Sequence, residues 1–250
     1  MPDREWLGYF LGFQNKKYAF GITDKGKAMI RVLDKKGSPL AQRLDISVDF
    51  VIEEHFPDGK VTKRTIKPES LESPHPASTE IRNAVIRGKV TGDGSFEIFL
   101  NEDDGLLSLG GRMLESGKLK NPLRFSIRLK FPEAYPKSEL EDRKQIRVFE
   151  SKLKGDRMLL TWTDNKRVRQ SISDEVDARA AAVNGPGIAL MQLEFSTYEG
   201  NKLEIAATGS SSINLSNNGS APLHTGFDLI WTADAKTDAT GEARLVIKVN

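Results

Sequence analysis

The sequence of 250 residues contains no cysteine. Without thiols the chain can form no disulfide, no thiolate nucleophile, no zinc finger and no iron–sulfur cluster. Only three histidines are present, His55, His75 and His224, and no two of them lie within one helical turn or on adjacent strand positions. We therefore expect no metal site, no cofactor and no catalytic residue.

Long apolar runs are absent too. No stretch approaches the roughly 18–20 apolar residues of a membrane-spanning helix. The N-terminal segment carries Asp3, Arg4 and Glu5 where a signal peptide needs an apolar run. We therefore expect a soluble, cytoplasmic protein without a membrane span. A net charge of only +2 predicts no strong binding to a polyanion.

The sequence is rich in alternating apolar and polar residues. In the segment 125–131, Phe125, Ile127 and Leu129 share one face of a strand, and polar residues occupy the other. The same alternation recurs in segments 47–52, 158–163, 188–197, 227–232 and 245–249. One apolar and one polar face per strand is typical of antiparallel sheets. The residues that we expect to be buried include Phe125, Ile127, Leu129, Phe227, Leu229 and Trp231.

Turn residues separate these segments. Pro57-Asp58-Gly59, Gly92-Asp93-Gly94 and Glu199-Gly200-Asn201 each supply the Gly and Asp that tight hairpins favour. Their spacing predicts about a dozen strands. The fold class we expect is all-β: an antiparallel sandwich or barrel with one or two short helices. The helix signals are a cap and strong helix formers in 173–182, and a capping box at 138–141.

An ordered set of matches between the two halves predicts an internal duplication. Phe20, Lys25, Gly26 and Met29 align without a gap with Phe149, Lys154, Gly155 and Met158. Further on, Phe96–Ile98 matches Leu203–Ile205, and Pro122-Leu123 matches Pro222-Leu223, each before an alternating strand. The predicted halves are residues 1–136 and 137–250, with a boundary near 132–145.

Two histidines were weighed as acid–base groups. On a strand, Glu53 and His55 share a face and Glu54 points away, so the pair could set a tautomer. A solvated strand end before the turn explains the same residues. His224 lies near Ser220 and Asp228, but no nucleophile signature accompanies it.

Two turns were weighed as ligand loops. Asn101–Gly105 is acidic, but it lacks the alternating twelve-residue spacing of a calcium loop. Gly92–Gly94 opens another strand instead of a helix, which argues against a phosphate loop. We interpret both as ordinary hairpin turns.

The segment from Lys118 to Arg169 is basic, with 15 Lys and Arg against 7 Asp and Glu. Nucleic-acid binding would need exposed aromatic side chains beside this charge. Phe125, Phe131 and Trp162 fall on the apolar faces instead, so we do not expect a nucleic-acid partner. Trp162 and Trp231 could line a sugar or lipid cleft, although burial in the core explains them equally.

The segment Leu106–Leu114 places five apolar side chains in what spacing predicts to be a connection between strands. Either it covers the protein's own sheet, which we favour, or it mediates self-association. The function that we predict is binding or assembly without catalysis. The alternatives are a barrel or sandwich that binds a sugar or a lipid, and a carboxylate-dependent hydrolase on a β scaffold.

Overall fold

The computed structural model describes residues 9–23, 25–40, 45–72, 82–133, 143–177, 179–217, 221–234, 236–238 and 240–250. No helix within these ranges is long and apolar enough to cross a membrane. The strands of the first half are β1 (Tyr9–Gln14), β2 (Tyr18–Thr23), β3 (Ala28–Val32), β4 (Ile46–His55), β5 (Val61–Arg64), β6 (Asn83–Lys89), β7 (Ser95–Asp103), β8 (Leu106–Glu115) and β9 (Leu123–Phe131).

In the described part of the second half, the α-helices are α1 (Arg143–Gly155) and α2 (Ala181–Asn184). Its strands are β10 (Arg157–Trp162), β11 (Arg167–Gln170), β12 (Ile188–Glu194), β13 (Leu203–Thr208), β14 (Ser211–Ser216), β15 (Phe227–Ala233) and β16 (Arg244–Val249). Short 3₁₀ turns are η1 (Pro68–Ser70), η3 (Ser196–Tyr198) and η4 (Leu223–Thr225).

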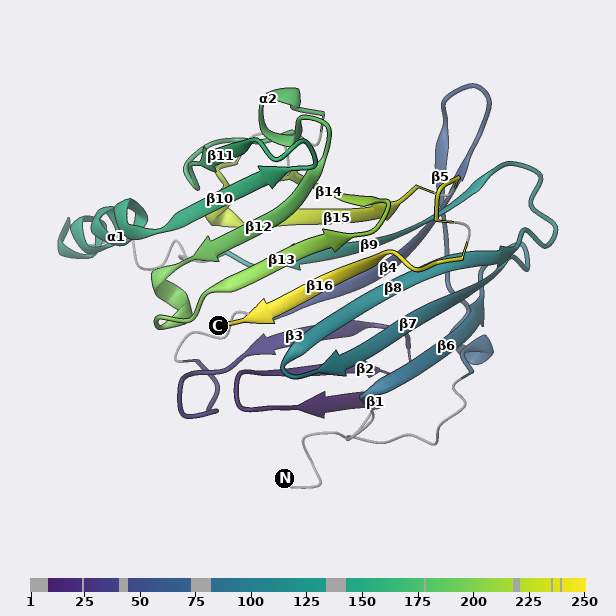
Figure 1. The fold of residues 1–250 in the computed structure, drawn as a ribbon, viewed down its shortest axis with the longest axis horizontal. Helices are drawn as coiled ribbons and strands as arrows, with labels where there is room; N and C mark the ends of the chain where they lie inside the picture. Colours follow the sequence, from purple (N-terminus) through teal and green to yellow (C-terminus); the bar gives the residue numbers. More distant parts are fainter. Residues whose placement is uncertain are drawn as a thin grey trace.

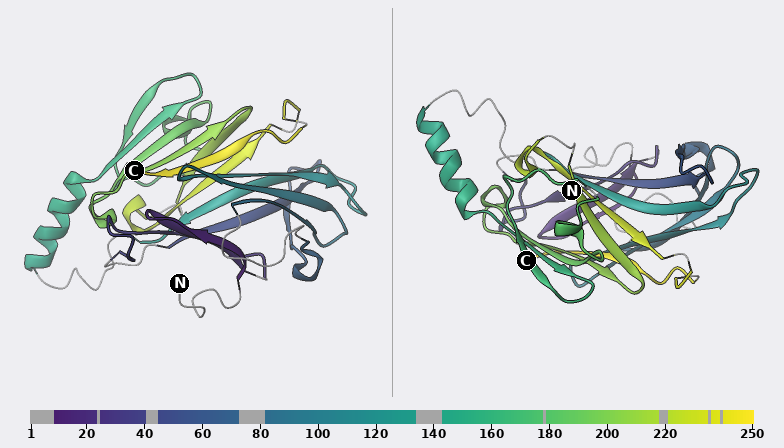
Figure 2. Two further views of the ribbon diagram at one scale, coloured as in Figure 1. Left: turned by 60° about the horizontal axis from the view of Figure 1, so that its bottom comes forward. Right: turned by 90° about the horizontal axis from the view of Figure 1, so that it is seen from above.

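All strands belong to one antiparallel sheet. Its order is β1-β2-β3-β4-β9-β15-β14-β12-β13-β16-β8-β7-β6, with β5, β10 and β11 attached at its side. Figures 1 and 2 show that this sheet curls, so that β12, β13, β16, β8, β7 and β6 form a layer facing β1–β4, β9 and β15. The predicted all-β antiparallel fold is confirmed.

The core lies between the two layers. All six side chains that alternation placed inside are at most 7% exposed, which confirms the predicted faces of β9 and β15. Direct register partners reinforce this packing: Ile127 lies opposite Trp231 and Leu129 opposite Leu229. The Phe131 and Phe227 rings stack at 4.4 Å between centroids.

Polar contacts also join the layers. The Asn201 side chain donates a hydrogen bond of 2.8 Å to the carbonyl of Leu33, across 168 positions of sequence. The Asn15 amide lies 3.5 Å from Glu102, which links the turn after β1 to the end of β7. Since β1 and β6–β8 lie at opposite ends of the strand order, this contact brings the two edges of the sheet together.

The helix predictions need correction. Among the described residues of segment 173–182, only 181–182 are helical, as the start of the four-residue α2, and 171–174 form a turn. The acidic residues there serve the turn instead: Asp174 accepts a bond of 2.7 Å from Gln170. The capping box at 138–141 lies outside the described residues. The longer helix is α1, in which Phe149 and Leu153 are four residues apart and share the face packed on the core.

The expected equivalence of the halves is not met. Phe20 belongs to strand β2 and the aligned Phe149 belongs to helix α1, so this part of the alignment is wrong. Later, β14, the strand before Pro222, pairs with β15, whereas β8, the strand before Pro122, pairs with β7 and β16 and not with β9. Alternation alone generates such matches between unrelated strands. The proposed boundary near 132–145 falls between β9 and α1, and the division into two domains stays a prediction.

The segment Leu106–Leu114 is not a connection but most of strand β8. Leu107 and Leu109 are fully buried against the chain's own core, which is the covering we favoured, and Leu114 is 41% exposed. Gly110 and Gly111 serve close packing: a Cβ on Gly111 would lie 2.3 Å from the Phe125 ring. Self-association through this segment stays a prediction.

Candidate functional site

The outer face of β4, β9, β15 and β14, here called the open face, carries polar side chains in rows across the four strands. Strand register places each row. One row contains Val51, Ser126, Thr232 and Ser212. The next contains Asp49, Arg128, Ile230 and Asn214. On the other side of the first row, Glu53 lies opposite Arg124. Alternation thus turns hydroxyl, amide and charged groups outward from a rigid β floor.

These rows form the floor of a groove with two compartments. The inner compartment has a volume of about 380 Å³, and its lining includes Glu53, Ser126, Arg128 and Asn214. The outer compartment, about 820 Å³, includes His55, Ser210, Asp234 and Lys236. The residues shared by both compartments are Arg124, Pro186, Ser212 and Thr232. The two cavities are therefore one continuous groove that passes Arg124.

The loop Gly185-Pro186-Gly187 walls the inner compartment. Its glycines permit close approach, because a Cβ on Gly185 would lie 2.6 Å from the Trp162 ring and one on Gly187 2.6 Å from the Ser212 Cβ. Both glycines have positive φ, at 50° and 111°. A side chain at Gly185 would clash with Trp162, and one at Gly187 with Ser212, so either would displace the loop.

Two neighbours hold this loop. The Asn184 side chain donates a hydrogen bond of 3.1 Å to the Leu215 carbonyl and accepts one of 2.8 Å from the Leu215 amide. It therefore satisfies both backbone groups of Leu215 in β14, as a neighbouring strand does. The indole of Trp162 donates 2.7 Å to the Val183 carbonyl. Trp162 therefore holds the loop that walls the groove in place without lining the groove itself. No Phe, Tyr or Trp is among the residues that line the two compartments in the described structure.

Charges near the floor are partly matched across strands. Lys130 Nζ lies 2.8 Å from Asp49 Oδ2, and Arg128 Nε lies 3.9 Å from Asp228 Oδ2. Burial raises the pKa of Asp228, against the opposing effect of Arg128 and Lys130. Two basic residues of the segment 118–169, Arg128 and Lys130, thus form ion pairs with carboxylates of other strands. The net positive charge of this segment is therefore partly neutralised in the folded chain.

Other polar groups of the groove are left available. Arg124 makes no ion pair within 4.0 Å to another described residue, although Glu53 is its register partner. Glu53 instead lies 3.8 Å from His55 Nε2, an ion-pair distance at which the buried nitrogen finds no hydrogen-bond partner in the described residues. The Nε of Arg128 likewise lacks a hydrogen bond. Arg124, which lines both compartments, is therefore the charged group of the groove that is available to a polar ligand.

The structure places the histidine candidates apart. Glu53 and His55 do share the open face, and Glu54 points inward, where it pairs with Arg64 and Asn121. Those partners lower the pKa of Glu54. His224 lies in η4, with Nδ1 3.3 Å from the Ile172 carbonyl and its ring against Phe149. Ser220 and His75 lie outside the described residues.

The acidic turn Asn101–Gly105 is the β7–β8 hairpin. Glu102 faces inward and binds Arg82 at 2.7 Å and the Gly105 amide at 3.1 Å. No group of three or more potential metal ligands occurs in the part of the chain that the structure describes. Trp231 is fully buried and Trp162 is 8% exposed, so neither lines a cleft.

Sequence reasoning missed Arg124, Ser126 and Asn214 as site residues. The available signal was the polar half of the same alternation that predicted the core. It could not identify the groove, because the strands that meet there are distant in sequence. Ser126 lies 75 positions from Val51, whose carbonyl is 3.4 Å from its hydroxyl.

No protein-family profile matches this sequence, and no curated protein sequence does. Solved structures similar in fold include the α-N-acetylgalactosaminidase NagBb from Bifidobacterium bifidum. Its Gal-NHAc-DNJ complex matches with a TM-score of 0.57 at 9% identity, and its GalNAc complex with a TM-score of 0.53 at 12% identity. Both matches cover 96% of this chain but only 36% and 35% of those chains. A galactose mutarotase related enzyme from Lactobacillus acidophilus matches at 9% identity with a TM-score of 0.48.

The likeness to the Bifidobacterium enzyme shows the fold alone, because identity is so low. This chain spans about a third of the length of those enzyme chains.

Proposed function

We propose that this protein binds a carbohydrate in the groove of the open face. The observation that carries the proposal is the lining of the inner compartment, where carboxylate, guanidinium, amide and hydroxyl groups converge on one cavity. Sugar hydroxyls both donate and accept hydrogen bonds, so they fit a lining that offers both donors and acceptors. The ring would be held by hydrogen bonds and not by aromatic stacking.

The chemistry of the lining argues against two other ligand classes. A lipid pocket would be mostly apolar, whereas Glu53, Arg124, Ser126, Arg128 and Asn214 dominate the inner compartment. A single-stranded nucleic acid would need exposed aromatic rings for stacking. Phe125, Phe131 and Trp162 are instead at most 8% exposed.

The fold comparison adds modest support and a choice of probe. The similar Bifidobacterium structures are complexes with GalNAc and with Gal-NHAc-DNJ. N-acetylgalactosamine is therefore the first sugar to test, with galactose and glucose beside it.

The test is a calorimetric titration of the protein with N-acetylgalactosamine. Saturable binding is expected, and Asn214→Ala should weaken it about tenfold, the size of one or two lost hydrogen bonds. Ser108→Ala, on the outer face of β8, is the control and should leave the affinity unchanged. Absence of saturable binding by all three sugars would contradict the proposal, as would full affinity in Asn214→Ala.

The proposal takes up the sugar-binding alternative that the sequence left open beside binding or assembly of unknown specificity. A carboxylate-dependent hydrolase stays the alternative, since Glu53 and Asp234 both line the groove. Incubation of N-acetylgalactosaminides with the protein distinguishes them: binding without release of the leaving group favours a binding protein.

A further inference from the structure

The connection between β15 and β16 walls the outer compartment. Asp234, Lys236 and Thr237 line that compartment. Asp238, the next residue, lines a third cavity of about 130 Å³ that also touches Arg124. The position of this connection therefore sets the width of the groove beyond Arg124.

The connection is tied together by its own aspartates. Asp234 Oδ1 accepts 2.9 Å from the Lys236 amide, and the Asp234 carbonyl accepts 2.8 Å from the Asp238 amide. Asp238 Oδ1 accepts a hydrogen bond of 2.7 Å from the Glu242 amide and one of 2.9 Å from the Ala243 amide. These bonds fix its internal shape but do not attach it to the sheet.

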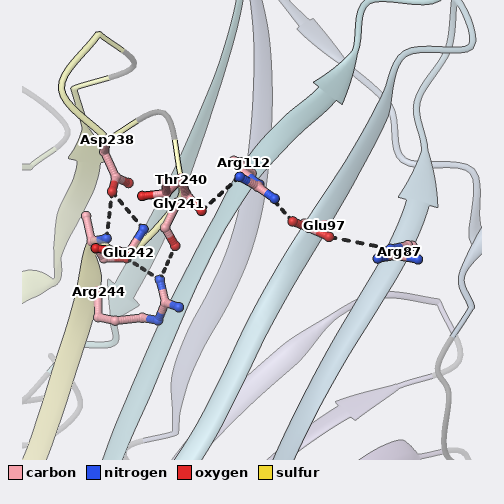
Figure 3. A network of polar contacts seen from close by, with 9 residues as sticks. Arg87, Glu97, Arg112, Asp238, Thr240, Gly241, Glu242 and Arg244 are labelled. Carbon is pink, nitrogen blue, oxygen red and sulfur yellow. Dashed lines mark hydrogen bonds and ion pairs between the residues drawn. The ribbon is translucent and has the colours of Figure 1, made fainter.

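The connection is attached to the sheet at several points: the Asp234 amide donates a hydrogen bond of 2.8 Å to the Ser210 carbonyl, and Arg244 of β16 donates to the Gly241 carbonyl. A further attachment comes from Arg112 on the outer face of β8 (Figure 3). Its Nη1 donates 2.8 Å to the Thr240 carbonyl, and its Nε donates 2.7 Å to Glu97 Oε1. Gly241 lies directly against the same side chain: with φ of 70°, a Cβ there would be 2.8 Å from Arg112 Cδ. One guanidinium thus bridges the sheet and the connection.

Glu97 holds Arg112 in place. It is only 3% exposed although it lies on the outer face of β7. Its register partners are Arg87 on β6 and Arg112 on β8, so one carboxylate lies between two arginines. Arg87 Nε is 3.4 Å from Glu97 Oε2, and β7 separates Arg87 from the strand that touches the connection. The two arginines share a partner, but only Arg112 is seen to hold the groove wall.

We propose that Arg112, held by Glu97, is a positioning residue that fixes the wall of the outer compartment, and that this wall makes the groove prefer an oligosaccharide to a monosaccharide. The inference rests on the proposed carbohydrate binding. A ring in the inner compartment, of about 380 Å³, occupies only part of the groove. Further rings continue past Arg124 into the outer compartment, of about 820 Å³, and contact Asp234, Lys236 and Thr237.

The test compares the affinities for N-acetylgalactosamine and for a trisaccharide ending in that sugar, measured by calorimetry. The wild type should bind the trisaccharide more tightly. Arg112→Gln should lose about tenfold of trisaccharide affinity, the size of one or two displaced hydrogen bonds, and keep its monosaccharide affinity. Arg112→Lys, which retains the charge beside Glu97, should restore part of the loss.

Arg87→Gln is the matched control, because it removes the other arginine from the same carboxylate and leaves the wall attached. It should keep the trisaccharide preference. Asp238→Ala serves if Arg112→Gln fails to fold: it loosens the connection without touching β8 and should cause the same selective loss.

The outcomes separate the two proposals. Equal binding of both ligands by the wild type, full trisaccharide affinity in Arg112→Gln, or equal loss of both ligands in that variant would each overturn the inference and leave carbohydrate binding intact. Failure of the wild type to bind either ligand would overturn the proposed function itself.

Discussion

The open face and the outer face of β6, β7, β8 and β16, here called the closed face, are built by the same alternation but treat their charges differently. On the closed face, Glu97 lies between Arg87 and Arg112, and the Arg244 guanidinium lies 4.6 Å from the centre of the Phe99 ring. On the open face, Glu53 and Arg124 are register partners that form no ion pair within 4.0 Å.

The difference teaches where a β sandwich can place a ligand. Polar residues in alternation predict only that a face is solvated. Glu97–Arg112 and Glu53–Arg124 are both direct register partners, but only the first pair forms an ion pair, so side-chain placement and not strand register separates the two faces. On the closed face the charged side chains pair with one another and stabilise the fold. On the open face Arg124 has no ion pair with another described residue and can contact a ligand.

The largest expected effect tests whether both faces rest on one core. Leu109 lies under the closed face and Leu229 under the open face, and both are at most 1% exposed. Leu109→Ala and Leu229→Ala should each lower the free energy of unfolding by about 2–5 kcal/mol, measured by urea denaturation. Leu114→Ala, at a 41% exposed position of β8, should cost about 0.5 kcal/mol or less. A tolerated Leu229→Ala would mean that the open face lies over a loose interior.

The next effect addresses the charges themselves. Glu97→Gln removes a buried charge from between two arginines and should cost about 1–3 kcal/mol of stability, a range reduced for the exposure of both arginines. Glu53→Gln, on the open face, should cost less than about 0.5 kcal/mol. Equal costs would contradict the distinction between the two faces.

The two tryptophans provide a smaller contrast. Trp162 donates through its indole to Val183 beside the groove loop, whereas the indole nitrogen of the buried Trp231 has no hydrogen-bond partner in the described residues. Trp162→Phe should lower the free energy of unfolding by about 1 kcal/mol beyond the effect of the change in packing, because a hydrogen bond is lost. Trp231→Phe should show no such additional loss. Thermal denaturation of both variants measures the difference, and sugar affinity should fall only in Trp162→Phe.

The smallest effects appear in the pH dependence of stability. Hydrogen bonds from Lys118 and Lys67 lower the pKa of Asp93 from 3.8 to about 2, and burial raises that of Asp228. Asp93 therefore contributes stability above its unfolded pKa that is lost as the pH falls towards 2, whereas ionisation of Asp228 disfavours the fold as the pH rises above 3.8.

Denaturation of two variants across the acid range tests these opposite signs. The free energy of unfolding of Asp93→Asn should lie furthest below that of the wild type at about pH 6, and the two values should converge near about pH 2. Asp228→Asn should gain relative stability as the pH rises from about 3 to 6. Parallel curves for both variants would contradict the assignment.

The faces of the strands could be predicted from the sequence because a period of two depends only on neighbouring residues. Phe125, Ile127 and Leu129 are buried as expected, and the turn at Gly92–Gly94 joins β6 to β7. The groove could not be predicted, since Ser126 meets Val51 and Thr232 only through pairing of distant strands. Alternation leaves such pairing open.

Two local errors have the same origin. The loop Gly185-Pro186-Gly187 was not recognised as part of a site, yet it forms the wall of the inner compartment. Spacing predicts a connection at Leu106–Leu114, yet the segment belongs to strand β8, where Gly110 and Gly111 allow Arg244 and Phe125 to pack closely. A glycine within a strand does not always mark a turn; it can also permit another side chain to pack closely against the backbone.

The most direct test of the account is to map where a sugar binds. Backbone amide chemical shifts of the protein should be recorded as N-acetylgalactosamine is added. The account predicts saturable shifts at Arg124, Ser126 and Asn214 on the open face and none at Arg87 or Glu97 on the closed face. Shifts centred on the closed face, or no saturable shifts at all, would contradict it.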